Sequence, residues 1–436
     1  MKPSLFVAAL AVAASLSAPA QTNVLAPLLA RDIIGPNLAL AEVQDYTENR
    51  IPLMPAVKSA AEWEKEAARL RRAAASAARV RAQANFFGRR AELDRLRNCL
   101  ETMRTGNSAL VMVEGEPGVG KSQLVAEFRR AIAAEGVTFL LGHADDIEHG
   151  TTYFIWREVL RQILSAAATR SVDAQRRYLE GVVAGEAELA AWLSLINDVL
   201  PLGFAEPAAL RGMSEQARAE STLKVLLDVL HCAIAAQPVV LVLEDAHWMD
   251  SVSWTLAARL LQREANLMLV LVMRSGYAPD SADGRDLLAQ TAAQRISLAS
   301  FSREDTATLV CDRLRVSRAP DELISLIFER TDGHPLFSEE LAYALRDSGY
   351  LLIRNGECLL AGNAARIDAP KMPETVEGII ASRVDRLAAD EQLTLKIASV
   401  LGRCFTQGAL CAVHPLQNDP QTVARQLERF VELDLL

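Results

Sequence analysis

The stretch GEPGVGKS at residues 115–122 has the residue types and spacing that hold a phosphate chain. Its key positions are Gly115, Gly118, Gly120, Lys121 and Ser122. Backbone N–H groups must point inward from a tight turn to bind phosphate oxygens, and glycine permits that backbone. The lysine would reach the terminal phosphates, and the serine hydroxyl would bind Mg²⁺. The pattern therefore predicts a nucleoside triphosphate and Mg²⁺ as ligands.

The context of this turn makes the pattern specific. A strand predicted at 108–113 precedes it, and a helix predicted at 122–134 follows it. A chance match to the spacing in a chain of this length is on the order of 1% from ordinary residue usage. We expect ligand contacts from the whole turn and the start of the helix, namely Gly115, Glu116, Pro117, Gly118, Val119, Gly120, Lys121, Ser122 and Gln123.

A pair of acids, Glu244 and Asp245, ends the apolar run 239–243. All strands of a parallel sheet end at the same edge as the ligand, so these acids are expected beside the phosphate turn. One of them would hold Mg²⁺ through water, and the other would polarise the attacking water. The sequence does not decide which acid has which role.

Two more polar residues are expected at this edge. Arg274 follows the apolar run 267–273 and would either stabilise charge at the γ-phosphate or cap the strand as a surface residue. His247 comes two residues after the acids, where it would couple to the metal site or make a structural contact.

Short apolar runs alternate with amphipathic helices from residue 85 to about residue 300, which predicts an α/β fold with a mainly parallel sheet. The expected strands are 108–113, 137–141, 239–243, 267–273 and 295–298, and a helical region fills 151–236. Helices dominate after residue 301. One exception is Asn355-Gly356, which lies between two apolar runs and predicts a hairpin.

Composition limits the function classes. A length of 436 residues suggests about three units at ~150 residues each. The net charge of −9 argues against the broad basic surface of a DNA-binding protein. Six scattered cysteines without a C-x-x-C pair predict neither a zinc module nor a disulfide framework, and they fit a reducing compartment.

The N-terminal sequence, in contrast, does not suggest a reducing compartment. Residues 1–20 combine Lys2, an apolar stretch and an Ala-Pro-Ala site, which is the pattern of a secretory signal peptide. Residues 46–72 also resemble the start of secreted acetyl-xylan-esterase-like hydrolases. That resemblance implies a G-x-S-x-G nucleophile motif downstream, and the sequence has none. No run is long enough to predict a membrane span.

The motifs in combination resemble the STAND branch of the AAA-like ATPases, as found behind class III adenylyl/guanylate cyclase domains and in large LuxR-type regulators. The resemblance covers roughly residues 85–436 and is carried by FFGRRAEL at 86–93, GEPGVGKS, LEDAHWMDSVSW at 243–254, Arg274 and TDGHPLFSEEL at 331–341. It implies a P-loop NTPase three-layer core with a parallel sheet, a helical lid and a partial winged-helix unit.

The resemblance also implies a function and further site residues. An ATP-driven signalling switch that hydrolyses slowly is expected, with ATP or ADP and Mg²⁺ bound. Phe87, Gly88 and Arg89 would line the adenine side, and Pro335 would touch the base from the lid. The alternative is a regulatory module in which nucleotide is bound without significant turnover. A protein partner or self-association is expected, whereas DNA contact through the winged helix is not supported by the charge.

The expected domains are a leader at 1–20, a segment with a helical arm at 21–84, a core at 85–301, a lid at 302–370 and a winged-helix-like unit at 371–436 that stops before the wing. An ATP-dependent function predicts a cytoplasmic location, with which the leader conflicts. Three explanations compete: the leader is not cleaved, it is a lipid-facing tether, or the gene joins a secreted-hydrolase start to an ATPase near residues 79–85. We favour the third.

Overall fold

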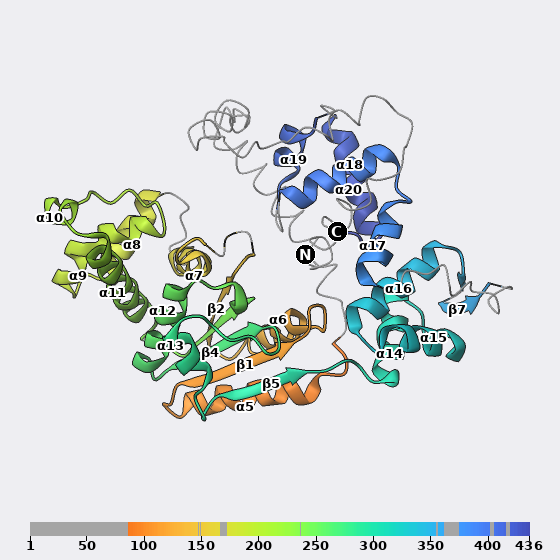
Figure 1. The fold of residues 1–436 in the computed structure, drawn as a ribbon, viewed down its shortest axis with the longest axis horizontal. Helices are drawn as coiled ribbons and strands as arrows, with labels where there is room; N and C mark the ends of the chain where they lie inside the picture. Colours follow the sequence, from red (N-terminus) through yellow and green to blue (C-terminus); the bar gives the residue numbers. More distant parts are fainter. Residues whose placement is uncertain are drawn as a thin grey trace. The chain divides into compact units, whose positions relative to one another are not determined.

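The computed structural model describes residues 86–146, 148, 150–165, 172–235, 237–354, 356–361, 375–401, 405–415 and 419–436. The leader predicted at 1–20 and the arm predicted at 21–84 lie outside these residues. The chain divides into two compact units (Figure 1). One is Phe86–Ser302, and the other contains the described residues from Arg303 to Leu436.

A five-stranded sheet forms the centre of the unit Phe86–Ser302, with strand order β2-β3-β4-β1-β5. The strands are β1 Ala109–Gly115, β2 Thr138–His143, β3 Val239–Glu244, β4 Leu267–Met273 and β5 Gln294–Leu298. All four strand pairings are parallel. The predicted α/β fold with a parallel sheet is confirmed, and the strand ends differ from the predicted ones by at most two residues.

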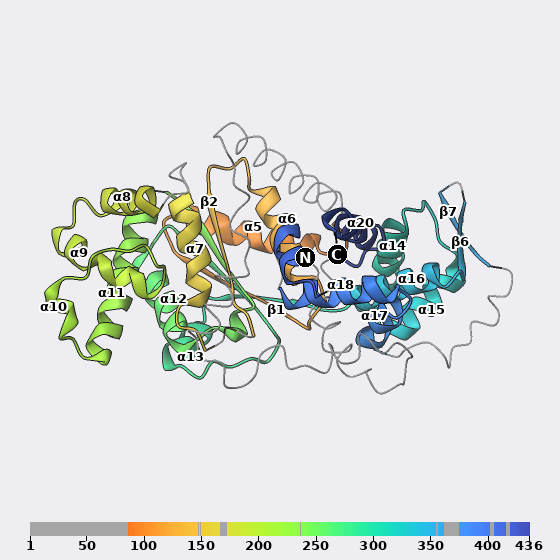
Figure 2. The same cartoon turned by 90° about the horizontal axis from the view of Figure 1, so that it is seen from above.

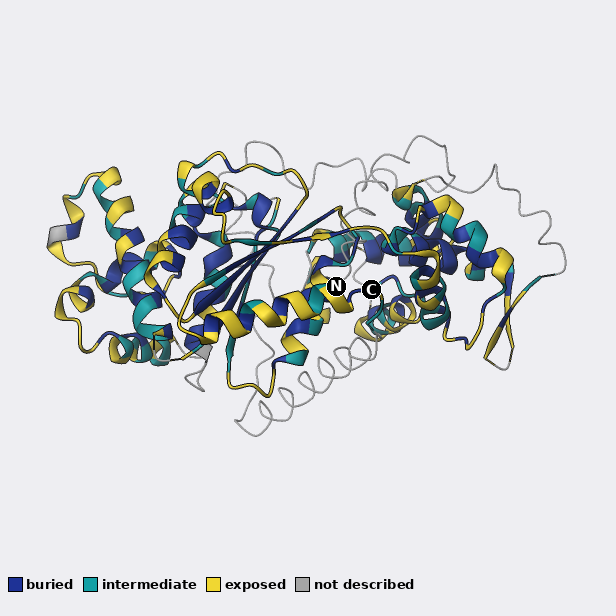
Figure 3. Ribbon diagram, turned by 90° about the horizontal axis from the view of Figure 1, so that it is seen from below, coloured by how far each residue is buried: buried dark blue, intermediate teal, exposed yellow. Residues whose placement is uncertain are grey.

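The two faces of this sheet carry different side chains because successive residues of a strand point to opposite sides. Valines such as Val111, Val242 and Val270 share a core with the helices α5 Arg90–Arg104 and α6 Lys121–Ala131. The opposite face is mostly leucine and packs against the other helices of the unit. Figure 3 shows the strands in dark blue between helices with exposed outer sides. Burial on both faces explains the continuous apolar runs in the sequence.

Helices fill the long connection between β2 and β3, as predicted for 151–236. They are α7 Phe154–Ser165, α8 Val172–Val182, α9 Ala187–Trp192, η1 Leu193–Asp198, α10 Ala208–Arg211 and α11 Glu215–Ile234. The turn η2 Ala246–Trp248 and the helices α12 Ser251–Arg263 and α13 Ala282–Leu288 come later. Helices α7, α12 and α13 cover the leucine face (Figure 2). Gly142 lets α7 approach β2, because a Cβ there would lie 2.6 Å from the carbonyl oxygen of Ile155.

The second unit is mainly helical. Its first part consists of α14 Arg303–Leu314, α15 Asp321–Thr331, α16 Pro335–Asp347, β6 Leu351–Arg354 and β7 Glu357–Leu360. Strands β6 and β7 pair antiparallel, with Leu351 opposite Leu360 and Arg354 opposite Glu357. The predicted hairpin is therefore confirmed. Gly356 has a φ of +78°, and Asn355 lies outside the described residues.

Four helices follow in the same unit: α17 Val376–Val384, α18 Ala389–Val400, α19 Gln407–Val413 and α20 Pro420–Glu432. Helices do not by themselves define a winged helix, so that assignment stays a prediction. Within the described parts of the chain, no helix combines the length and the apolar character that crossing a bilayer requires.

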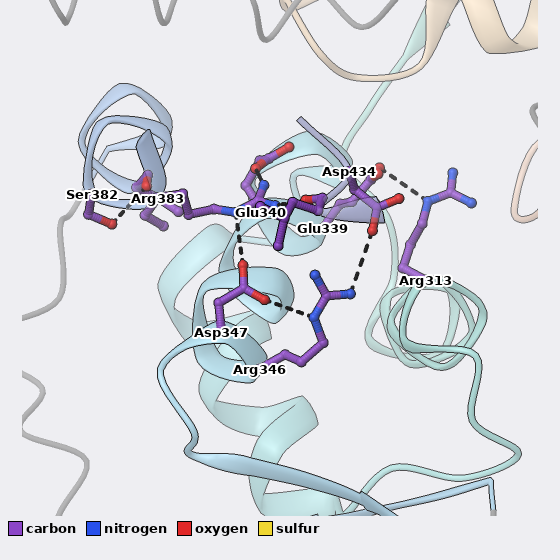
Figure 4. Close-up of polar contacts among 10 residues, drawn as sticks. Arg313, Glu339, Glu340, Arg346, Asp347, Ser382, Arg383 and Asp434 are labelled. Atoms are coloured by element: carbon purple, nitrogen blue, oxygen red, sulfur yellow. Dashed lines mark hydrogen bonds and ion pairs between the residues drawn. The ribbon is translucent and has the colours of Figure 1, made fainter. Parts of the chain in front are cut away.

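A buried ion cluster connects α17 to α16 and to the C-terminal residues (Figure 4). The side chains of Arg383 and Glu340 are each 2% exposed and form an ion pair. Arg383 also donates to the Leu433 carbonyl oxygen, and its Nε lies 3.3 Å from Asp347 Oδ2. Arg346 contacts Asp347 at 2.9 Å on the same helix. Three segments of the unit therefore depend on one guanidinium.

Removal of the Arg383 guanidinium should lower the stability of this unit. Arg383→Met removes the guanidinium that pairs with the buried Glu340 carboxylate, and breaking a buried ion pair by removing one partner costs about 3 to 5 kcal/mol. We expect faster hydrogen exchange in peptides from α16 and α17, measured by mass spectrometry. The described tryptophans Trp156, Trp192, Trp248 and Trp254 all belong to the other unit, so hydrogen exchange reports on this unit more directly than tryptophan fluorescence does.

The control for this experiment is Arg429→Met, because the Arg429 side chain is 59% exposed, although its partner Glu391 is largely buried. Arg429→Met should change the free energy of unfolding by no more than about 1 kcal/mol. The double variant Arg383→Met with Glu340→Leu should recover most of the protection, since neither charge is then left alone. Equal exchange in Arg383→Met and Arg429→Met would refute this account of the cluster.

Candidate nucleotide-binding site

The glycine-rich turn connects the end of β1 to the start of α6. Gly118 and Gly120 have φ values of +82° and +100°, which favour glycine over other residues. At position 115 a larger residue would not fit without a shift, because a Cβ there would lie 2.7 Å from a Val119 methyl carbon. No side chain caps the N-terminus of α6, whose cap residue is Gly120. The first backbone N–H groups of this helix can thus face an anion.

Lys121 lies across this turn. Its ammonium donates to the carbonyl oxygens of Gly115 at 2.8 Å and Glu116 at 2.9 Å. Burial lowers the pKa of Lys121, Asp245 opposes that shift, and Arg274 adds to it. The charges of Asp245 and Arg274 therefore both act on the Lys121 ammonium.

The acid at the end of β3 lies beside the turn, as the parallel sheet predicts. The hydroxyl of Ser122 donates to Glu244 Oε2 at 3.2 Å. Glu244 is 5% exposed, so its carboxylate depends on these local partners. The structure thus joins residues that are 122 positions apart in the sequence.

His143 is a site residue that sequence reasoning missed. It ends β2 directly opposite Glu244 in the register of β2 and β3. Its Nε2 lies 3.2 Å from Glu244 Oε2, and its Nδ1 lies 2.8 Å from Glu158 Oε2 on α7. Burial alone would lower the pKa of His143, but the contacts with Glu158 and Glu244 outweigh it and raise the pKa to about 9. At neutral pH the ring is a cation that donates to both acids.

The remaining predicted residues of this edge follow β3 and β4. Asp245 has a φ of +53° in the turn after β3. His247 is 9% exposed, and burial, with Arg274 and Lys121 nearby, lowers its pKa to about 4. The Arg274 guanidinium is exposed and lies 5.4 Å from the centre of the Trp248 ring.

Arg89 has contacts that the resemblance did not suggest. Its guanidinium donates to the carbonyl oxygens of Val119, at 3.4 Å, and Ala299, and it lies 4.7 Å from the centre of the Phe301 ring. It therefore braces the phosphate turn against the segment after β5. Gly88 before it has a φ of +61°, and Phe87 is half-buried.

Pro335 belongs to the other compact unit. It is the buried first residue of α16, after a turn in which Asp332 and Gly333 have φ values of +50° and +67°. The ring nitrogen of His334 accepts from the Phe337 N–H at 3.3 Å and caps the helix. The predicted contact of Pro335 with a base stays a prediction.

The donor set fits Mg²⁺ only together with a phosphate ligand. Across the described residues, no group of three or more His, Cys, Asp or Glu side chains is arranged to hold a metal ion. Mg²⁺ is usually held by one or two carboxylates, waters and substrate phosphates. Ser122 and Glu244 provide a hydroxyl and a carboxylate in contact, which suits that kind of site.

The His143 contacts predict a pH dependence of stability without nucleotide or divalent cations. The pKa of His143 is about 9 in the folded chain and 6.5 ordinarily. A raised pKa means that the stabilisation is complete below pH 6.5 and is lost as the pH rises to about 9. The free energy of unfolding should fall across this interval, as measured by urea titration with tryptophan fluorescence.

In His143→Gln this part of the pH dependence should be absent, and in Glu158→Gln it should be smaller than in the wild type. The buried Trp156 and Trp254 belong to the same unit and report on its unfolding. An unchanged slope in His143→Gln would show that the imidazolium does not stabilise this edge.

Comparison with known families agrees with this geometry. A family model described as "AAA ATPase domain" matches residues 85–273. A second model, described as a domain of unknown function (DUF8739), matches residues 302–359.

Among curated proteins, adenylate cyclase type 10 of Mus musculus is 21% identical over 386 residues, which cover 76% of this chain and 23% of the relative. The uncharacterized protein R02095 of Rhizobium meliloti is 23% identical over 347 residues, covering 76% of this chain and 31% of the relative. This chain therefore spans less than a third of the length of these relatives.

A solved structure of the Aeropyrum pernix ORC1 protein in complex with DNA is 14% identical, covers 80% of this chain and 85% of that one, and has a TM-score of 0.37. That likeness is too weak to carry an argument. The family match over residues 85–273, the parallel sheet and the glycine-rich turn after β1 together support an AAA-like P-loop ATPase module in this part of the chain.

Proposed function

We propose that this chain is an ATP-binding and slowly hydrolysing switch of the STAND type. The observation that carries the proposal is the 3.2 Å contact between Ser122 and Glu244, because it couples the phosphate turn to the acidic strand end. A turn without an acid would bind phosphate but lack half of a hydrolytic site.

The roles of the residues follow from their contacts. An ammonium has three N–H donors, and the carbonyl oxygens of Gly115 and Glu116 accept two of them. We assign the third to the terminal phosphates of ATP. Arg274 adds positive charge where negative charge develops during hydrolysis.

The two acids take different roles in this proposal. We assign Glu244 to Mg²⁺, and its contact with the Ser122 hydroxyl supports this assignment. Bound Mg²⁺ would neutralise phosphate charge. Asp245 follows in a left-handed turn, and we assign it to orienting the attacking water.

The switch itself would need contacts with ATP from both units. Phe87, Gly88 and Arg89 on the core side and Pro335 on the lid side are the proposed contacts with the base. A ligand held by two units favours one arrangement of them over another, which is sufficient for signalling. The matched cyclases support a place within a larger signalling protein, with a protein partner or self-association as output. A cytoplasmic location is part of this proposal, since ATP is abundant there.

The alternative function is a regulatory module that binds nucleotide without significant turnover. The exposed, rather than enclosed, Arg274 side chain favours it, because an exposed cation stabilises charge less. DNA as the output has little support, since the net charge of −9 opposes phosphate binding over a wide surface.

Nucleotide binding by the full chain tests the proposal. Lys121→Ala should weaken ATP binding by about 10- to 100-fold, the value of one lost charge-assisted hydrogen bond. Isothermal titration calorimetry with Mg²⁺ measures this affinity. Lys224→Ala is the control, because Lys224 is exposed on α11. The ATP affinity of this variant should equal that of the wild type. Unchanged affinity in Lys121→Ala refutes the phosphate site.

Variants of the acids separate the switch ATPase from the binding module. Asp245→Asn should keep ATP affinity and reduce phosphate release by about 10²- to 10⁴-fold. Glu244→Gln should abolish the dependence of ATP affinity on Mg²⁺. Wild-type turnover no higher than that of Asp245→Asn would favour the binding module.

A further inference from the structure

Two side chains of helix α7 bind strand β2, and the proposed hydrolysis uses neither of them. Strand β2 lies at the edge of the sheet, so its outward backbone groups need partners other than β3. The amide of Gln162 provides two such partners for one residue. Its Oε1 accepts from the Leu141 N–H at 3.0 Å, and its Nε2 donates to the Leu141 carbonyl oxygen at 2.6 Å. Gln162 thus takes the place of a neighbouring strand at this position.

The second side chain is that of Glu158, which lies on the same face of α7 because residues four apart on a helix are neighbours. Its Oε2 lies 2.8 Å from Nδ1 of His143, two residues after Leu141 in β2. The other ring nitrogen, Nε2, lies 3.2 Å from Glu244 Oε2. Contacts at both nitrogens fix the orientation of a histidine ring. The position of the His143 ring therefore depends on α7.

The close packing of α7 on β2 makes these contacts sensitive to a displacement of the helix. A Cβ at Gly142 would lie 2.6 Å from the Ile155 carbonyl oxygen and 3.1 Å from a Val159 methyl carbon, so a larger residue would force the helix away. Directly before the helix, Tyr153 has a φ of +59°, and its N–H donates to Asp250 Oδ2 at 3.1 Å. Residues other than glycine keep this conformation only where their surroundings hold them in it. The structure thus holds α7 in one place at both its start and its middle.

The His143 ring transmits the position of α7 to the acidic end of β3. Glu244 Oε2 lies 3.2 Å from the Ser122 hydroxyl and 3.2 Å from the His143 ring. Both contacts fall on the same oxygen, so the orientation of the carboxylate depends on where these two donors lie. Ser122 belongs to the phosphate turn, whereas the His143 ring is held from α7. Partners that orient metal ligands in this way commonly determine the metal affinity of a site.

We propose that Gln162 and Glu158 are positioning residues for Glu244. Gln162 anchors α7 on the edge of β2, and Glu158 then holds the His143 ring against the Glu244 carboxylate. This inference rests on the proposed function, since it requires Mg²⁺ bound with ATP beside Ser122. Both side chains act through His143 and not on the nucleotide itself. A displacement of α7 would therefore weaken Mg²⁺ binding and leave the phosphate turn intact.

Two variants of the full chain test this role. Gln162→Met removes both hydrogen bonds to Leu141 and keeps the length of the side chain. Glu158→Met removes the contact with His143 at a side chain that is 44% exposed, so it leaves the fold intact. Gln216→Met is the matched control, because Gln216 is exposed on α11. Calorimetry measures the affinity for ATP with saturating Mg²⁺ and in EDTA, and the ratio of these two affinities is compared between the variants.

In each single variant this ratio should fall by about 10-fold, the lower end of the loss expected when an outer partner of a metal site is removed. The affinity in EDTA should stay at the wild-type value, because the phosphate turn is unchanged. The double variant of Gln162 and Glu158 should lose no more than the larger single loss, since both side chains act along one path. Gln216→Met should keep the wild-type ratio.

A purely structural role of these side chains would lower both affinities together or leave both unchanged. Either result overturns the inference, and so does a double variant whose loss is the product of the two single losses. Urea titration followed by tryptophan fluorescence establishes that each variant is folded before its affinities are compared. The buried Trp156 lies on α7 and reports directly on this helix.

The failure of this inference differs from the failure of the proposed function. If Glu244→Gln removes the Mg²⁺ dependence while Gln162→Met and Glu158→Met keep the wild-type ratio, the assignment of Glu244 to Mg²⁺ stands and the role of α7 is wrong. If the wild type binds ATP equally well with Mg²⁺ and in EDTA, the assignment of Glu244 is wrong, and the inference fails with it.

Discussion

The Glu244 carboxylate contacts both the Ser122 hydroxyl and the His143 ring. The organisation of the site depends on these two contacts. A buried carboxylate is costly unless donors or cations surround it. Each partner comes from a different part of the chain, one from the start of α6 and one from the end of β2. The parallel sheet brings these partners to Glu244 because all of its strands end at the same edge.

Much of this arrangement could be predicted from the sequence. The glycine spacing identified the phosphate turn, and the apolar runs identified β1, β3 and β4 because these inner strands are buried on both faces. The edge strands β2 and β5 are only partly buried, and their shorter apolar runs were still sufficient to locate them. The position of the acids beside the turn then followed from the parallel order. The strand ends were less predictable. Strand β2 continues through Gly142 and His143, which pair with β3 although neither residue is typical of a strand. His143 was missed for that reason.

Long-range contacts made by charged residues could not be predicted. Arg89 belongs to a recognisable motif, yet its contacts with the Val119 and Ala299 carbonyl oxygens join positions far apart in the sequence. Arg383 has no motif at all, and its burial against Glu340 follows from the packing of α16 and α17. In sequence, such residues are indistinguishable from the solvated arginines that most helices carry.

The division of the sheet into a valine face and a leucine face separates two packing environments. The helix that carries the phosphate turn packs on the valine side with α5, whereas the long helical connection between β2 and β3 packs on the leucine side. Insertions, deletions or a new docking surface in that connection leave the packing beneath the turn unchanged. The long connection can thus change in length or in surface while the turn after β1 keeps its support.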